Sequence, residues 1–308
     1  MSLRRLIKRI IMAAGLVSAA LLINGTDCHA AVRQMADGTL FDADYYRNAN
    51  PDVVAVFGSS DAAMYQHYKE YGQKEGRPAY SGLDIKNTPV SLSLFPRIGV
   101  IGDSFASGAI NKNGKITDTY YVSWPQVMGK RYGVTVTNYT RGGLYTGNWL
   151  TVPEGLSKLN RTQADDLYML VLGNNDCYGV GFGEAYLGTI KDIKGKTDMS
   201  QYANSFYGNY GRIIELIRAH APKAKLVMVT MAFADPQGMK YNRAIEEIAK
   251  YYGIPYIRQY TDPFFLTDTY QNMDLGHPTT EAYSGMADAF ARLLTENVEK
   301  NRYYYLSR

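Results

Sequence analysis

The chain contains the three residue types that serine acyl-transfer chemistry uses, in Ser104, His277 and Asp274. Ser104 lies in Gly102-Asp103-Ser104-Phe105, directly after an apolar run, where a hydroxyl at a strand end can attack a carbonyl carbon. The tripeptide alone carries little weight, because Gly-Asp-Ser also occurs in ordinary turns. It is not the Gly-x-Ser-x-Gly elbow either, since position 106 is alanine. The serine hypothesis therefore depends on partners elsewhere in the sequence.

A serine nucleophile needs a general base, and few histidines are available after residue 30. His67 lies in a small Tyr-rich segment, and His220 ends a predicted helix, where a cationic ring has a sufficient structural role. His277 lies in the loop Asp274-Leu275-Gly276-His277-Pro278, before a predicted helix. A carboxylate three residues before an imidazole can fix its tautomer and stabilise the imidazolium. We expect His277 as general base with Asp274 beside it; the alternative is that both merely shape the loop.

Two further loops offer hydrogen-bond donors for an oxyanion. The first ends in Arg141-Gly142-Gly143, where glycine lets a backbone N–H approach a substrate closely. The second is Gly173-Asn174-Asn175-Asp176, where a side-chain amide can donate another bond. Each loop alone is equally well explained as a turn. Their joint position after successive strands favours function, and spacing does not decide between Gly142 and Gly143.

An alternation of strands and helices must position these loops. Short apolar runs typical of strands buried on both faces occupy residues 98–101, 134–136, 167–172, 226–231 and 254–257. Helical patterns occupy residues 202–220 and 241–252, and a last helix begins at Thr279 or Thr280 and runs to about Val298. This pattern predicts an α/β fold with a three-layer, doubly wound parallel sheet. In that architecture functional groups lie in loops after the strand carboxyl ends.

At this point the chain resembles the SGNH or GDSL hydrolase superfamily over residues 96–298. Gly102-Asp103-Ser104 resembles its first block, Gly143 the glycine of the second, Gly173-Asn174-Asn175-Asp176 the third, and Asp274-Leu275-Gly276-His277 the last. The resemblance implies a flavodoxin-like sheet and hydrolysis through a serine acyl-enzyme, with no metal and no cofactor. It also implies an oxyanion hole formed by Ser104, Gly143 and Asn175.

Other residues near these loops are weaker candidates. Gly142, Asn174 and Trp149 are candidate substrate contacts; Trp149, like Tyr145 and Tyr178, is equally well explained by core packing. Cys177 follows the third block, and we expect a buried, inert thiol, because the serine mechanism needs none.

The N-terminal part predicts export. Residues 1–30 combine four basic side chains with the apolar run 10–23 and small residues before position 31, as in a cleavable signal peptide; the alternative is an uncleaved anchor. Removing them takes away four basic groups and one acidic group, which lowers the formal charge from +4 to +1. The remaining chain shows no basic cluster, so we expect no nucleic-acid partner.

A small Tyr-rich module is expected at residues 38–80, followed by a linker at 81–95 and the hydrolase domain at 96–308. Apolar residues at helical spacing around Pro51 predict two short helices in the module. Tyr45-Tyr46, Asn50-Pro51-Asp52-Val53, His67-Tyr68 and Glu75-Gly76-Arg77 resemble a module of Gram-positive surface proteins. That resemblance implies a surface setting, and cell-wall association through residues 38–80 is a further expectation.

Together these features predict a secreted or cell-surface serine esterase. Its expected substrate is a short acyl ester, acetyl foremost, on a glycan of the cell wall or the environment. One alternative is an O-acyltransferase that uses the same site with a sugar hydroxyl as acceptor. The other is a non-catalytic cell-surface binding protein in which the module is the functional part.

Overall fold

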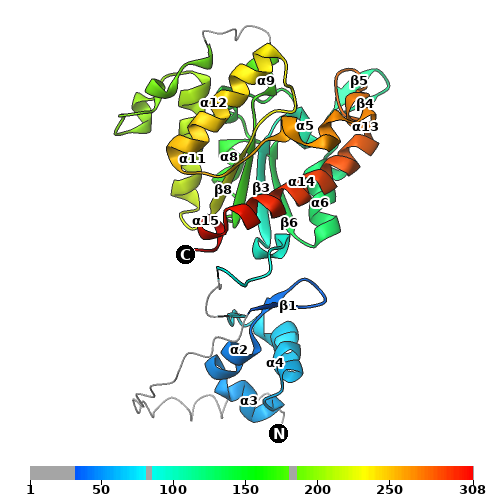
Figure 1. Cartoon of the computed structure of the whole chain (residues 1–308), viewed down its shortest axis with the longest axis vertical. Coiled ribbons are helices and arrows are strands. Elements are labelled where there is room, and N and C mark those ends of the chain that lie inside the picture. The colour runs from blue at the N-terminus through cyan, green and yellow to red at the C-terminus, as the bar shows by residue number, and fades with distance from the viewer. Residues whose placement is uncertain (1–31, 81–84, 180–185, 308) are drawn as a thin grey trace. The chain divides into compact units, whose positions relative to one another are not determined.

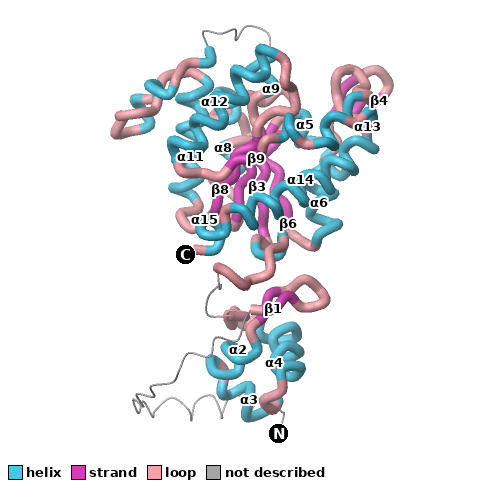
Figure 2. The backbone as a smooth tube through the Cα atoms, in the orientation of Figure 1, coloured by secondary structure: helices cyan, strands magenta, loops and turns pink. Residues whose placement is uncertain are grey.

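The fold is described from a computed structural model, which describes residues 32–80, 85–179 and 186–307. Its centre is a sheet of five strands in the order β6-β3-β7-β8-β9, and every neighbouring pair is parallel. The strands are β3 (Arg97–Gly102), β6 (Thr135–Thr140), β7 (Leu167–Val171), β8 (Lys225–Val229) and β9 (Tyr256–Ile257). This arrangement confirms the predicted doubly wound α/β fold (Figures 1 and 2).

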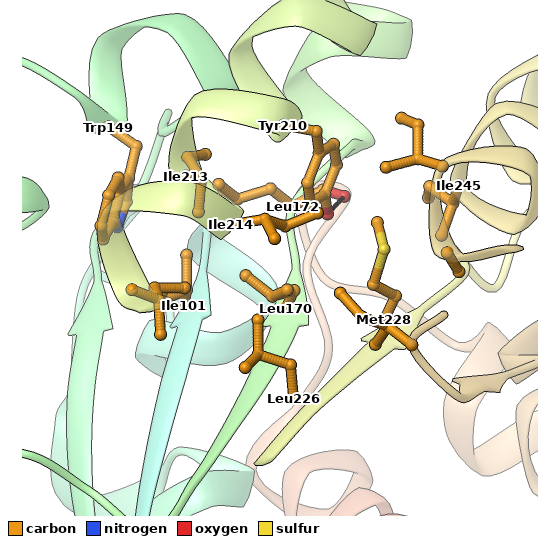
Figure 3. Close-up of a cluster of buried hydrophobic side chains, with 14 of the residues drawn as sticks. Ile101, Trp149, Leu170, Leu172, Tyr210, Ile213, Ile214, Leu226, Met228 and Ile245 are labelled. Atoms are coloured by element: carbon orange, nitrogen blue, oxygen red, sulfur yellow. Dashed lines mark hydrogen bonds between the residues drawn. The ribbon is translucent and has the colours of Figure 1, made fainter. Parts of the chain in front are cut away.

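Helices cover both faces of the sheet. On one face, α11 (Phe206–His220) and α12 (Pro236–Tyr252) bury Ile213, Ile214 and Ile245 against alternate strand residues (Figure 3). On the other, α6 (Trp124–Tyr132) and α14 (Thr280–Lys300) bury Trp124 and Phe290. Successive residues of β3, such as Val100 and Ile101, enter opposite cores. Burial on both faces explains why each strand is a short, nearly continuous apolar run.

Capping side chains set the helix boundaries. Helix α11 begins four residues after the predicted position, because Ser205 accepts the N–H of Gly208 and caps it there. Helix α12 begins five residues before the predicted position, because Asp235 caps it and Pro236 is accepted in its first turn. Of the two predicted caps, Thr279 and Thr280, it is Thr279 that caps α14, by accepting the N–H of Ala282.

Shorter elements connect this frame. They are α5 (Ser104–Ser107), β4 (Ile110–Lys112), β5 (Lys115–Thr117), α7 (Thr146–Trp149), α8 (Leu156–Leu159), α9 (Asn174–Tyr178), α13 (Asp268–Gln271), α15 (Arg302–Leu306) and the 3-10 turns η2 (Leu92–Leu94), η3 (Tyr120–Val122), η4 (Ile190–Asp192), η5 (Met199–Gln201), η6 (Gln259–Thr261) and η7 (Pro263–Leu266). The β4 and β5 strands form an antiparallel hairpin directly after α5.

The N-terminal module is more divided than the two predicted helices. Its elements are β1 (Arg33–Gln34), β2 (Leu40–Phe41), α2 (Ala43–Ala49), α3 (Pro51–Phe57), α4 (Asp61–His67) and the π-helical turn η1 (Tyr68–Gly72). The prediction of two helices was wrong, because Pro51 starts a new helix directly after α2 and Ser60 caps another after Gly58. Phe41, Tyr46 and Met64 form a small buried core.

The predicted linker is shorter than its range of 81–95. Leu92 and Phe95 are buried in the core that contains α14, and Arg302 donates to the carbonyl oxygens of Ile85 and Thr88, each at 2.9 Å. Residues 85–95 therefore belong to the domain that contains the five-stranded sheet, and residues 81–84 lie outside the described structure. The predicted export signal also lies outside it. Within the described part, no helix combines the length and apolar character needed to cross a membrane.

Candidate active site

The strand register places three candidate loops next to one another. Gly102, the last residue of β3, pairs with Thr140 at the end of β6 on one side and with Val171 at the end of β7 on the other. Ser104 follows Gly102 by two residues, Gly143 follows Thr140 by three, and Asn175 follows Val171 by four. Because parallel strands end at the same edge, the three residues project from adjacent loops of one edge. Figure 1 shows α5 and α9 at this end of the sheet.

Ser104 is held in a tightly fixed turn. Asp103 caps α5 by accepting the N–H of Phe105 at 2.9 Å, and Ser104 is the first helical residue, with 6% of its surface exposed. Its carbonyl oxygen accepts from the hydroxyl of Tyr283 at 3.0 Å. Gly108, with φ of 72°, ends the helix in a conformation that favours glycine. The nucleophile candidate is thus fixed by its neighbours on both sides.

His277 lies beside this turn. Its ring centroid lies 5.8 Å from that of Phe105, the residue that follows Ser104. Asp274 and His277 close a two-residue turn through paired backbone hydrogen bonds of 2.9 and 3.0 Å. The turn needs positive φ at Leu275 (48°) and Gly276 (75°), the conformation of a tight hairpin turn. This geometry holds the imidazole close to the serine loop.

The side chain of Asp274 departs from the predicted arrangement. Its carboxylate accepts from the Nδ2 of Asn111, at 3.1 and 3.2 Å, and Nδ1 of His277 lies 3.1 Å from the carbonyl oxygen of Leu275. Within the described residues, the side chains of Asp274 and His277 are not hydrogen-bonded to each other. The reason is local: the β4–β5 hairpin brings an amide to the carboxylate, and the tight turn brings its own carbonyl to the ring.

The oxyanion loop distinguishes Gly142 from Gly143. The N–H of Gly142 donates to both carboxylate oxygens of Asp118, at 3.0 and 3.1 Å. In the part of the chain that the structure describes, the N–H of Gly143 has no acceptor. Gly143 also has φ of 76° and open space where a side chain would stand. The geometry therefore favours Gly143 as the donor and gives Gly142 a structural role.

The third-block asparagines have different partners. Asn175 donates one amide N–H to the carbonyl oxygen of Leu144 at 2.9 Å, which leaves its second N–H for a ligand. Asn174 donates to the carboxylate of Asp103 at 3.1 Å, and its own Oδ1 is buried without a partner among the described residues. Asn174 therefore supports the serine turn, and the prediction that it contacts substrate finds no support here.

Two buried carboxylates lie beneath the site. Burial raises the pKa of Asp103 to about 7, against the opposing hydrogen bonds of Phe105 and Asn174. Burial likewise raises the pKa of Asp176 to about 7, although Thr146 donates both its backbone N–H and its hydroxyl to that carboxylate. Asp176 thereby ties α9, which carries Asn175, to the start of α7. Both carboxylates fix loops and neither reaches the surface.

Trp149 was wrong as a candidate substrate contact. Its side chain is fully buried, and its indole N–H donates to the carbonyl oxygen of Tyr139 at 3.1 Å. Figure 3 shows the indole within the core. Cys177 is buried, as predicted, and burial raises the pKa of its thiol to about 11, which disfavours the reactive thiolate. Tyr178, by contrast, is 47% exposed.

Asp118 and Asn111 were missed at the sequence level. Asp118 accepts from Gly142 and also from the hydroxyl of Ser107, so it joins the oxyanion loop to α5. Asn111 reaches Asp274 from the hairpin. Both lie in a polar stretch after α5 with no motif, and Gly142 and Asp274, their partners in the other loops, are 24 and 163 residues away. Local spacing carries no signal for contacts of that separation.

The part of the chain that holds the sheet and its loops is similar to known proteins. Residues 100–284 match the model of the GDSL-like Lipase/Acylhydrolase family. One solved structure with 23% identity covers 65% of this chain and 96% of its own, with a TM-score of 0.50. A putative GDSL-like lipase from Bacteroides uniformis covers 65% and 95%, at 14% identity and a TM-score of 0.49. The esterase EstA from Pseudoalteromonas sp. covers 65% and 97%, at 15% and 0.45. Curated proteins gave no match.

Proposed function

The chain belongs to the GDSL-like lipase/acylhydrolase family and is a serine hydrolase, and we propose that it removes short acyl groups, acetyl foremost, from a polysaccharide outside the cell. The observation that carries the proposal is the placement of Ser104, Gly143 and Asn175 on adjacent strand ends, with His277 beside Phe105. A nucleophile, a base and oxyanion donors at one edge are the parts that acyl transfer requires.

In the proposed mechanism, the Oγ of Ser104 attacks the ester carbonyl carbon while His277 takes the hydroxyl proton. The oxyanion accepts from the N–H groups of Ser104 and Gly143 and from the free amide N–H of Asn175. His277 then gives its proton to the leaving alcohol, which breaks the ester bond and leaves an acyl-serine. Water, deprotonated by His277, releases the acid and restores Ser104.

Asp274 has a supporting role in this proposal. Its backbone already fixes the turn that carries His277, and its carboxylate lies on the same turn. When the imidazole becomes a cation, attraction between opposite charges favours a closer approach of the carboxylate. The bond to Asn111 holds the carboxylate in the meantime. Hydrogen bonds of unliganded catalytic groups are often looser than those in the reacting complex.

A short acyl group is consistent with the packing behind the oxyanion loops. Leu144 and Trp149, which follow Gly143, are fully buried in the core that the sheet shares with α11. An acyl chain that extended in this direction would meet packed side chains, and well-packed cores resist insertion. The ring of His277 is partly exposed, so water can reach the acyl-enzyme.

The extracellular setting rests on the N-terminal sequence. The basic, apolar and small-residue sections of residues 1–30 support export. The module at 38–80 exposes Phe57 and Tyr71, whose rings pack with His67. Exposed aromatic rings suit adhesion to glycans, which supports cell-wall association.

Product analysis tests the proposed substrate. Purified protein is incubated with acetylated glycans and with chromogenic esters of increasing acyl length. We expect acetate release from the glycans and rates that fall as the acyl chain lengthens. Efficient cleavage of long-chain lipid esters without acetate release from any glycan would overturn the proposal.

A further inference from the structure

Three aromatic side chains form a row beside the catalytic residues. Phe105 and Phe233 lie edge to face, with ring centroids 6.0 Å apart, and Tyr178 lies edge to face with Phe233 at 5.4 Å. Phe105 and Phe233 are half-buried, whereas Tyr178 is largely exposed. They follow three neighbouring strands: Phe105 lies in α5 after β3, Tyr178 ends α9 after β7, and Phe233 lies in the loop after β8. We call these three residues the aromatic ledge.

The ledge begins at the imidazole that handles the proton. The ring of Phe105 lies 5.8 Å from that of His277, with 33° between their planes. In ester cleavage the base returns its proton to the oxygen of the leaving alcohol, so that oxygen must lie against the imidazole. The carbonyl oxygen, in contrast, points to the oxyanion donors. The alcohol half of the ester is therefore the half that lies along the ledge.

The outer end of the ledge is polar. The hydroxyl of Tyr178 donates to the carboxylate of Asp235, which also accepts the N–H groups of Gln237 and Gly238 at the start of α12. Gly238 makes this possible, because a Cβ there would stand 2.7 Å from the hydroxyl oxygen of Tyr178. Asp235 itself is exposed. Apolar ring faces thus lead to an accessible, fixed hydrogen-bond acceptor.

We propose that the aromatic ledge binds the alcohol half of the ester as a pyranose ring, with the apolar face of the sugar on one ring of the Phe105–Phe233 pair and its edge against the other. Its hydroxyl groups donate to Asp235 and Tyr178 at the outer end. This assignment rests on the proposed esterase function and adds the subsite and the residues that select the alcohol. An aryl alcohol shares the flat apolar face but lacks hydroxyl groups for Asp235.

The test compares three acetyl esters: an acetylated pyranoside, 4-nitrophenyl acetate and ethyl acetate. Phe233→Ala should raise KM for the pyranoside and the aryl ester by about tenfold, the scale of one lost ring contact, and leave kcat/KM for ethyl acetate unchanged. Tyr178→Phe keeps the ring and loses the hydroxyl, so it should raise KM for the pyranoside alone. Tyr251→Ala, which removes a 42% exposed tyrosine of α12 from outside the site, is the matched control and should change none of the three.

Other results would overturn the assignment. Equal loss on all three esters in Phe233→Ala and in the bulk-preserving Phe233→Leu would show that the residue does not select the alcohol. A change in acyl-length preference at constant alcohol would assign the ledge to the acyl half. Equal loss on sugar and aryl esters in Tyr178→Phe would exclude the sugar. If wild type cleaves the pyranoside and neither variant differs, the ledge alone fails; if wild type cleaves no acetylated sugar, the proposed substrate fails with it.

Discussion

At the scale of single residues, the imidazole of His277 has two possible hydrogen-bond acceptors within its own turn, a backbone carbonyl and a side-chain carboxylate. Nδ1 of His277 lies 3.1 Å from the carbonyl oxygen of Leu275, and the carboxylate of Asp274 is held by Asn111. A neutral carbonyl orients the ring, but only a carboxylate supplies the negative charge that stabilises an imidazolium. The two oxygens therefore make separable contributions, and substitutions can measure them.

Asp274→Asn should lower kcat by roughly 10²- to 10⁴-fold with little change in KM, because the imidazolium loses its counter-charge. Asn111→Ala removes the competing donor and should change kcat by no more than about threefold. Steady-state kinetics on 4-nitrophenyl acetate measure both. If Asn111→Ala proved as damaging as Asp274→Asn, the carboxylate would serve the hairpin and not the base.

Asp118 is a positioning residue of the oxyanion loop. Asp118→Asn leaves one acceptor oxygen for two donors, Gly142 and Ser107, so Gly143 should shift. We expect kcat to fall about tenfold with KM unchanged, which is a part of the loss expected when an oxyanion donor is removed outright. Asp192→Asn is the matched control, because Asp192 also accepts from a backbone N–H and a serine hydroxyl, far along the chain. Equal kinetic effects of the two variants would refute the assignment.

At the scale of elements, two buried carboxyl groups beneath the site, Asp103 and Asp176, make the stability of the fold depend on pH. The pKa of Asp103, raised by burial to about 7, lies well above the ordinary 3.8 of the unfolded chain. Between these values the folded state holds a proton that the unfolded state has released, so this group makes the fold less stable as pH rises through that window. Asp176 on α9 acts in the same direction.

Asp103→Asn should therefore remove part of this pH dependence. Asn174 can turn its unpartnered Oδ1 toward the new amide, so the hydrogen bond can be kept. The difference in free energy of unfolding between the variant and wild type, measured in urea, should favour the variant more at pH 8 than at pH 5. The exposed Asp268→Asn serves as control. Parallel curves for wild type and Asp103→Asn would contradict the buried charge.

The elements also show what the sequence could predict. Strands buried on both faces are apolar runs, so the positions of these runs along the sequence predicted the sheet and the edge at which the site lies. The caps Ser205 and Asp235 set the starts of α11 and α12. The predicted starts came from hydrophobic spacing and were therefore wrong by a few residues. Trp149 was misassigned because burial of an aromatic ring near a loop is decided by packing. Asp118 depends on a long-range contact, which no local pattern encodes.

At the scale of the whole molecule, the Tyr-rich module and the hydrolase domain have separate cores. All residues proposed for chemistry lie between Ser104 and His277. Deleting residues 31–80 should leave kcat/KM on 4-nitrophenyl acetate within about twofold, because no side chain of the site is removed. Attachment to cell walls, measured by sedimentation, should be lost. Retained attachment together with lost turnover would reverse the roles given to the two parts.

Ser104 is the proposed nucleophile on which every other role in the site depends. A fluorophosphonate probe reacts with a serine activated by its base and forms a stable bond to Oγ. We predict that intact protein is labelled at one site, that peptide mass spectrometry places the label on Ser104, and that Ser104→Ala abolishes both labelling and turnover while Ser107→Ala retains labelling. Labelling or undiminished esterase activity in folded Ser104→Ala protein would contradict the account.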